Sequence, residues 1–168
     1  RALARAKGVK PAQITALILD RPRHADLIAK VRKVGCSIRL ITDGDVAGVI
    51  HTAQPETHID IYLGIGGAPE GVLAAGALRC VGGQMQSRLI LDSPAKVERA
   101  AKMGITDPKR KYDLTEMAGG DVIVAATGVT DGALLFGVRF KGEVIETQTI
   151  VYRSITGTVR KIEAEHRE

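Results

Sequence analysis

The sequence has few aromatic residues and no tryptophan. Phenylalanine, tyrosine and tryptophan together make up 3% of the 168 residues, whereas hydrophobic residues of all kinds make up 45%. Because proteins that bind single-stranded nucleic acid stack its bases on aromatic side chains, this scarcity argues against a nucleic-acid partner. The hydrophobic content is ordinary for a globular protein, and the length suits one domain with its own core. We therefore expect residues 1–168 to form a single domain.

Cysteine is equally scarce, and long apolar runs are absent. Cys36 and Cys80 lie near glycine and apolar residues, so we expect two buried free thiols and a reducing, cytoplasmic location. Two cysteines and four dispersed histidines do not form a zinc-ligand pattern. No apolar run is long enough to cross a bilayer, so no membrane partner is expected. The first residue, Arg1, is not methionine, and we expect the chain to be part of a longer protein or a processed or trimmed product.

The formal net charge is +5, with lysine and arginine scattered along the chain. Scattered basic residues are typical of a soluble, mildly basic surface. The same charge would also attract anionic ligands such as sugar phosphates, and both interpretations stay open at this point.

The first half of the chain alternates apolar runs with helical patterns. ITALIL (residues 14–19) is a continuous apolar run of the kind that forms a buried strand, and Gly35 stands where a glycine ends a helix. Because such alternation gives parallel strands, the loops after the strands should meet at one sheet edge, where open α/β sheets bind ligands. Three units are predicted, with strands at Ile14–Leu19, Ser37–Thr42 and His58–Gly64 and helices at Ala25–Val34, Val46–Thr52 and Val72–Cys80.

The second half has a different pattern, with more predicted strands and short turns. Ser93 is placed to cap a charged helix, Ala95–Gly104. The overall prediction is an α/β fold: a layered α/β/α domain with a largely parallel sheet and an antiparallel C-terminal extension. The further strands are predicted at Gly83–Leu91, Asp121–Thr127, Leu134–Phe140, Val144–Arg153 and Thr158–Glu163.

The loop after the first strand reads DRPRH. Arg21 and Arg23 flank Pro22, which limits the freedom of the backbone, and arginine has the planar shape that binds phosphate with two bonds. The alternative is a solvated loop with a capping role. His24 could act as a base, although a histidine at a helix start more often caps or packs.

The loop after the second strand reads DGD. Asp43 and Asp45 could chelate a cation or accept hydrogen bonds from sugar hydroxyls. The simpler interpretation, which we favour for Asp45, is a helix N-cap with Gly44 making the turn. A later segment, Thr127–Gly132, also follows a strand, and we favour a structural turn there.

The loop after the third strand, GIGGAPEG, is rich in glycine. It lacks the Lys-Ser or Lys-Thr of a phosphate-binding loop, and Pro69 stands where a dinucleotide-binding fingerprint needs its third glycine. Glycines still let backbone N–H groups approach an anion closely. Glu70 lies in the first helical turn, where it either stabilises the helix end or binds a metal ion that bridges to a phosphate.

Five blocks together resemble the class II fructose-1,6-bisphosphatases, in family order and over about Ile14 to His166. The blocks are DRPRH, LITDGDVAGVI, GIGGAPEGVLAAGALRCVGG, AATGVTDGALLFGVR and RSITGTVR. The resemblance is to the C-terminal half of that family, a lithium-sensitive, metal-dependent group of sugar phosphatases. It implies hydrolysis of the 1-phosphate of fructose 1,6-bisphosphate, and in some members of sedoheptulose 1,7-bisphosphate, in gluconeogenesis or a sugar-phosphate cycle.

The resemblance also implies roles for individual residues. It makes Glu70 a ligand of Mn²⁺ or Mg²⁺, and it implies that the partners are fructose 1,6-bisphosphate, the N-terminal half of the same enzyme and further copies in a homo-oligomer. That N-terminal half supplies most metal carboxylates, and nothing like them occurs here. Because such ions need several oxygen ligands, we expect this chain alone to be inactive or nearly so. The implied substrate contacts are Arg21, Pro22, Arg23, Asp43, Gly44, Asp45 and Gly67.

Two other classes of function remain open from the residues alone. The first is a binding module without catalysis that senses a phosphorylated metabolite or a nucleotide. The second, weaker because the third glycine is missing, is a dinucleotide-dependent oxidoreductase.

Overall fold

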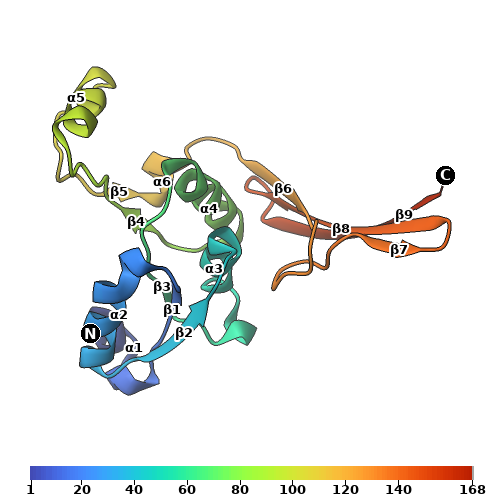
Figure 1. The fold of residues 1–168 in the computed structure, drawn as a ribbon, viewed down its shortest axis with the longest axis horizontal. Coiled ribbons are helices and arrows are strands. Elements are labelled where there is room, and N and C mark those ends of the chain that lie inside the picture. The colour runs from blue at the N-terminus through green and yellow to red at the C-terminus, as the bar shows by residue number, and fades with distance from the viewer. Residues whose placement is uncertain (168) are drawn as a thin grey trace.

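The structure is a computed structural model that describes residues 1–167, with two main sheets separated by helices (Figure 1). The helices are α1 (Ala2–Lys7), α2 (Ala25–Val34), α3 (Asp45–His51), α4 (Ala68–Val81), α5 (Pro94–Lys102) and α6 (Leu114–Met117). The strands are β1 (Thr15–Leu19), β2 (Ser37–Ile41), β3 (Ile61–Tyr62), β4 (Gln86–Ser87), β5 (Tyr112–Asp113), β6 (Ile123–Thr127), β7 (Arg139–Lys141), β8 (Val144–Arg153) and β9 (Thr158–Arg167). The mixed α/β class predicted from the sequence is confirmed.

The first sheet has the strand order β2-β1-β3, and both pairings are parallel as predicted. Strand β1 lies in the middle, which suits its continuous apolar sequence, because a central parallel strand is covered on both faces. Leu17 and Ile18 are 1% and 0% exposed. Strand β3 is shorter than predicted and pairs with β1 only at Ile61 and Tyr62.

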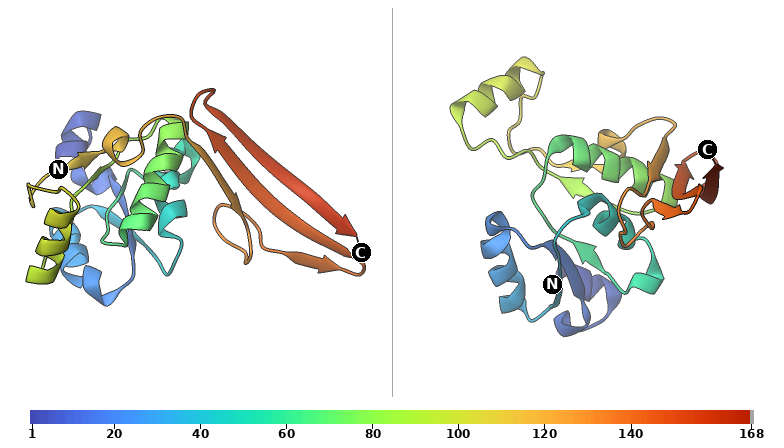
Figure 2. Two further views of the ribbon diagram at one scale, coloured as in Figure 1. Left: turned by 90° about the horizontal axis from the view of Figure 1, so that it is seen from above. Right: turned by 45° about the vertical axis from the view of Figure 1, so that its right-hand side comes forward.

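The elements form successive layers (Figures 1 and 2). Helices α1 and α2 lie on one side of the first sheet, α3 and α4 on the other, and the second sheet lies beyond α4. Helix α3 lies very close to the sheet. A Cβ atom at Gly48 would lie only 3.0 Å from the side chain of Leu17 and 3.1 Å from that of Ile41. Gly48 therefore allows the close approach between this helix and the strands.

The second sheet is the predicted antiparallel extension. Strand β8 pairs antiparallel with β6, β7 and β9, and the long β8–β9 hairpin projects away from the layers (Figure 2). Near the layers, Ile150 and Tyr152 pack in one cluster with Ala77 and Cys80 of α4. Helix α4 is therefore packed between α3 and the second sheet.

Besides β3, three predicted segments differ from the observed strands in extent or in sheet partner. Within Gly83–Leu91 only β4 forms, paired with β5 in a separate two-stranded ribbon. The predicted strand Asp121–Thr127 exists as β6 but belongs to the antiparallel sheet, and most of Leu134–Phe140 is a loop before β7. A strand is defined by its pairing partner, which the alternation of residues does not encode.

Helix α5 stands apart from the rest of the chain (Figure 1). Its N-cap is Ser93, as predicted, whose hydroxyl accepts from Lys96 N at 3.4 Å. Both cysteines are free, but only Cys80 is buried; Cys36 is partly exposed and corrects the prediction of two buried thiols. Among residues 1–167, no helix is both long and apolar enough to span a membrane.

Candidate functional site

Three loops meet at the carboxyl ends of β1, β2 and β3, as the parallel arrangement predicted. Asp20, just after β1, donates its N–H to Ile41 O of β2 at 2.8 Å. Leu63, just after β3, donates its N–H to Leu17 O at 3.0 Å. These bonds hold the starts of the loops side by side at one edge of the sheet.

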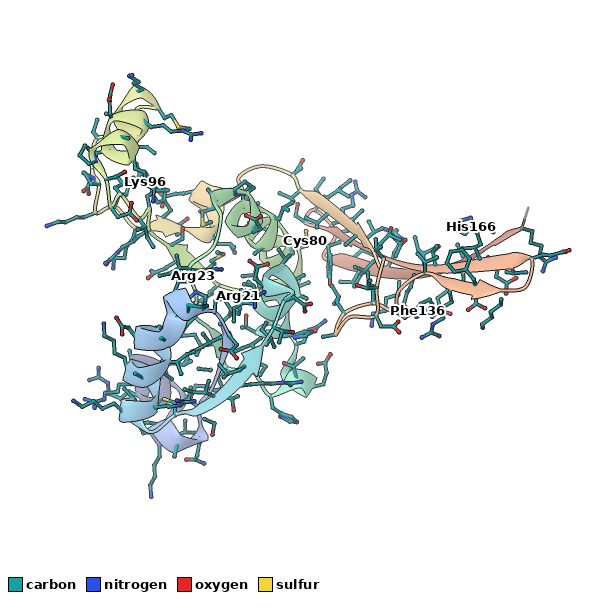
Figure 3. All side chains as sticks on the ribbon, in the orientation of Figure 1. Arg21, Arg23, Cys80, Lys96, Phe136 and His166 are labelled. Atoms are coloured by element: carbon teal, nitrogen blue, oxygen red, sulfur yellow. The ribbon has the colours of Figure 1, made fainter. Side chains whose placement is uncertain are left out.

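The loop after β1 is joined to the glycine-rich loop by side chains. Arg23 Nε donates to Ile65 O at 2.8 Å, and the buried His24 ring contacts the backbone of the same residue. Arg21 Nη1 donates to the neighbouring Asp20 O at 3.1 Å, and Arg21 and Arg23 lie at the same end of the sheet (Figure 3). Pro22 is exposed and begins a 3-10 turn. Two guanidinium groups are therefore available for an anion at this edge.

The loop after β2 places Asp45 beside the glycine-rich loop. Gly44, with φ 72°, is the N-cap of α3, and Asp45 is the first helical residue. The prediction that Asp45 is the N-cap is therefore wrong by one position, because the left-handed turn falls on the glycine. Asp45 Oδ1 accepts from Val46 N at 2.9 Å, and Asp45 Oδ2 lies 3.4 Å from where a Cβ atom of Gly66 would be.

Tyr62 also belongs to this site, although the sequence analysis did not single it out. Its hydroxyl lies 3.1 Å from the position of a Cβ atom at Gly64, so the ring folds back over the start of the glycine-rich loop. Burial and the nearby Asp45 charge raise the pKa of Tyr62 to about 12, while Arg23 opposes the rise. The rarity of aromatic residues, together with a tyrosine next to the loop, was the available signal.

Helix α4 begins where the glycine-rich loop ends. Gly67 is its N-cap, Pro69 lies in the first turn and Glu70 follows in the same turn, as predicted. A Cβ atom at Gly67 would overlap Glu70 Oε2 and lie 3.2 Å from Glu70 Cδ. The Glu70 carboxylate therefore reaches back across Gly67, and both residues are exposed.

The metal ion implied by the family resemblance needs more ligands than this chain brings together. Within residues 1–167, no three His, Cys, Asp or Glu side chains gather in a group that could hold a metal ion. Glu70 is the carboxylate that reaches back over the loop, and a single oxygen donor group does not meet the coordination that Mn²⁺ or Mg²⁺ requires. The residues present do not form a complete metal site.

Asp43 lies on a second feature, a groove of about 480 Å³ between the loop after β2 and residues 128–135. Gly44 and Thr130 also line this groove. The segment 128–137 is held by an internal bond, from Gly137 N to Asp131 Oδ1 at 2.8 Å, and by a bond to β8, from Phe136 N to Gln148 Oε1 at 2.9 Å. The segment therefore has the internal structure of a turn and faces the DGD loop as well.

Comparison with known proteins identifies the family. The model of the bacterial, glpX-encoded fructose-1,6-bisphosphatases matches residues 1–166. A protein from Synechococcus elongatus named D-fructose 1,6-bisphosphatase class 2/sedoheptulose 1,7-bisphosphatase is 40% identical over an alignment 167 residues long, and the match covers 92% of this chain and 48% of that protein. A Synechocystis protein of the same name matches with the same identity, and the match covers the same fraction of each chain.

The chain spans about half the length of the curated relatives it matches. The match extends from the first strand through the second sheet and includes all three loops at the sheet edge. This chain therefore belongs to the bacterial class II fructose-1,6-bisphosphatase family.

Proposed function

We propose that the protein containing this chain hydrolyses the 1-phosphate of fructose 1,6-bisphosphate to give fructose 6-phosphate and phosphate. The relatives' names support this proposal and also point to sedoheptulose 1,7-bisphosphate as a second substrate. Residues 1–168 would form one domain of the enzyme, and the rest of it would supply the remaining metal ligands. We further propose a cytoplasmic homo-oligomer.

The observation that carries the proposal is the convergence of the three loops. Arg23 is bonded to Ile65, and Asp45 lies beside Gly66, so residues from all three loops are brought to one sheet edge. The guanidinium groups of Arg23, which is exposed, and Arg21, which is partly exposed, would bind a phosphate of the sugar. The oxygens of Asp43 and Asp45 would accept hydrogen bonds from sugar hydroxyls, and Gly44 and Gly67 would leave room for the ligand.

Glu70 would supply one ligand to a divalent cation, Mn²⁺ or Mg²⁺, at the same edge. Because the described chain holds no complete metal site, we expect residues 1–168 alone to release little or no phosphate. The bound sugar bisphosphate would be oriented by the arginine and aspartate side chains, and orientation of this kind lowers the barrier for the attack of water.

The test is phosphate release from fructose 1,6-bisphosphate with Mn²⁺, using the full-length gene product that contains this chain. The variant Glu70→Gln should lower kcat/KM by about 100-fold or more, since even the outer-shell partners of metal ligands are worth about 10- to 100-fold. Glu98→Gln on α5 is the matched control, because Glu98 is exposed and its ion-pair partner is Lys102 of the same helix. It should leave the rate unchanged.

Full activity in Glu70→Gln would contradict the role of Glu70 and leave it as a helix-end residue. Binding of fructose 1,6-bisphosphate without phosphate release from the wild-type protein would contradict the phosphatase. That result would support the alternative, a binding module for phosphorylated metabolites or nucleotides.

A further inference from the structure

We propose that His24 is a positioning residue that fixes the glycine-rich loop, and thereby Gly67 and Glu70, for the reaction. The inference rests on the proposed function. His24 is 0% exposed, and its two ring nitrogens contact the end of strand β1 and the glycine-rich loop. Nδ1 lies 2.8 Å from Leu19 O at the end of β1, and Ile65 N donates to Nε2 at 2.9 Å.

The partners determine the protonation of the ring. A backbone N–H can only donate, so Nε2 must offer its lone pair to Ile65 N. The proton is then on Nδ1, which donates to Leu19 O, and the ring is neutral. The 3.2 Å approach of Nε2 to Ile65 O is consequently a contact between two acceptors and not a hydrogen bond. A neutral histidine with this tautomer satisfies one carbonyl and one N–H at once.

Ile65 is held at both of its backbone groups. His24 accepts from Ile65 N, and Arg23 Nε donates to Ile65 O at 2.8 Å. We call these two bonds the Ile65 clamp. Both side chains come from the loop after β1, so the clamp ties that loop to the glycine-rich loop.

The loop needs such a clamp because it has little else to hold it. Within residues 1–167, no backbone–backbone hydrogen bond involves residues 64–66. Gly64, Gly66 and Gly67 have no side chains to pack, and glycine loses more conformational freedom on ordering than other residues. Without His24 the loop would sample several conformations. The loop would then no longer hold Gly67, the N-cap of α4, in one position.

The experiment compares three substitutions of His24 in the full-length gene product. The amide of His24→Asn can replace Nδ1 and bond Leu19 O, but it is too short to reach Ile65. The longer His24→Gln can place its oxygen near the position of Nε2 and accept from Ile65 N. His24→Ala loses both bonds. His166→Gln is the matched control, since His166 is exposed on β9 and bonds Thr147.

For fructose 1,6-bisphosphate hydrolysis, we expect His24→Ala and His24→Asn to lose about 10- to 100-fold in kcat/KM, mainly in kcat. His24→Gln should recover a large part of this loss. A purely structural role would instead favour Asn at least as much as Gln, because Asn keeps the bond to the buried carbonyl. Equal activity of Asn and Gln would overturn the proposal.

Hydrogen exchange of the Ile65 amide tests the clamp without relying on activity. Exchange should be slow in the wild-type protein and in His24→Gln, and faster in His24→Asn and His24→Ala at matched global stability. Unchanged Ile65 exchange in all variants would overturn the proposal. If the wild-type protein does not hydrolyse the substrate while Ile65 exchange follows the expected order, the proposed reaction fails and the clamp stands.

Discussion

The Glu70 carboxylate lies across Gly67, three residues earlier in the chain. A Cβ atom at position 67 would overlap Glu70 Oε2, so this direction of the glutamate is available only because residue 67 is glycine. The φ of Gly67 is −69°, which any residue can adopt. The requirement for glycine is therefore one of space, and it connects a proposed substrate contact with a proposed metal ligand.

Gly67→Ala should separate activity from stability. The clash involves the far end of a flexible side chain, so the glutamate can turn away and the free energy of unfolding should change by no more than about 1 kcal/mol. The displaced carboxylate should lower kcat/KM by about 100-fold, the loss that a shift of about 1 Å can produce. Thermal unfolding and phosphate release measure the two effects.

Gly71→Ala is the matched control for Gly67→Ala. Apart from the backbone of its own helix, the nearest described atom to a Cβ at Gly71 would be Cε of Met117, at 3.6 Å. Alanine in a helix interior is favoured over glycine by about 1 kcal/mol, so this variant should gain stability and keep its activity. Equal activity of the two variants would show that Gly67 does not direct Glu70.

Tyr62 should titrate unusually late. Burial, and after it the Asp45 carboxylate, raises the pKa of this phenol to about 12, and Arg23 acts in the opposite direction. In a titration of phenolate absorbance, corrected by subtracting Tyr62→Phe, Asp45→Asn should lower the Tyr62 midpoint and Arg23→Gln should raise it. If neither substitution moves the midpoint, Tyr62 does not lie between these charges.

Asp60 should make the fold sensitive to acid. Its burial disfavours the charge, but the side-chain bond from Lys7 and the N–H of Thr15, 2.7 Å from Oδ2, outweigh this and lower the pKa of Asp60 below 3.8. A carboxyl whose pKa is lower in the folded state stabilises the fold above its unfolded pKa, and this stability is lost as the pH falls.

Denaturant unfolding of wild-type protein and Asp60→Asn measures the effect of this carboxylate. The difference between their unfolding free energies should be largest near neutral pH and should shrink as the pH falls below about 4. A difference that stays constant with pH would mean that the charge of Asp60 contributes nothing.

Tyr152→Phe should not destabilise the protein. The Tyr152 hydroxyl is buried without a hydrogen-bond partner among residues 1–167, and the residue is 1% exposed. Because a buried, unpaired hydroxyl costs free energy, its removal should leave the unfolding free energy unchanged or raise it by about 1 kcal/mol. Ile150→Val is the control and should cost about 1 kcal/mol. A clear loss of stability in Tyr152→Phe would mean that the hydroxyl has a partner, such as a buried water.

Local patterns predicted the elements whose partners follow from chain order. The apolar run of β1 and the capping residues of α2 and α5 are legible in the sequence because each depends on neighbouring residues. The pairing partner of β6 cannot be predicted in this way, since the same alternation of residues suits a parallel or an antiparallel neighbour. The strand predicted over Gly83–Leu91 is longer than the observed β4 for the same reason.

The candidate site shows the same division. The loop residues at the sheet edge were predicted from glycine, proline and charge patterns and from a family resemblance. The contacts of Tyr62 and His24 were not predicted, because the direction of a side chain depends on the residues that pack around it. His24 was interpreted as a residue that caps or packs. It is indeed buried, but its ring also bonds a loop 41 residues away in sequence.

Helix α4 connects the second sheet to the candidate site, and this affects which substitutions abolish function. Ala77 near its C-terminal end packs with Ile150 in one cluster, while Glu70 stands at its N-terminal end. Interiors this closely packed pass a change of volume onward instead of absorbing it. A screen for loss of function would therefore return positions in the second sheet, such as Ile150, beside those in the loops. The positions that do not tolerate substitution would include the residues that pack against α4 as well as the residues of the site itself.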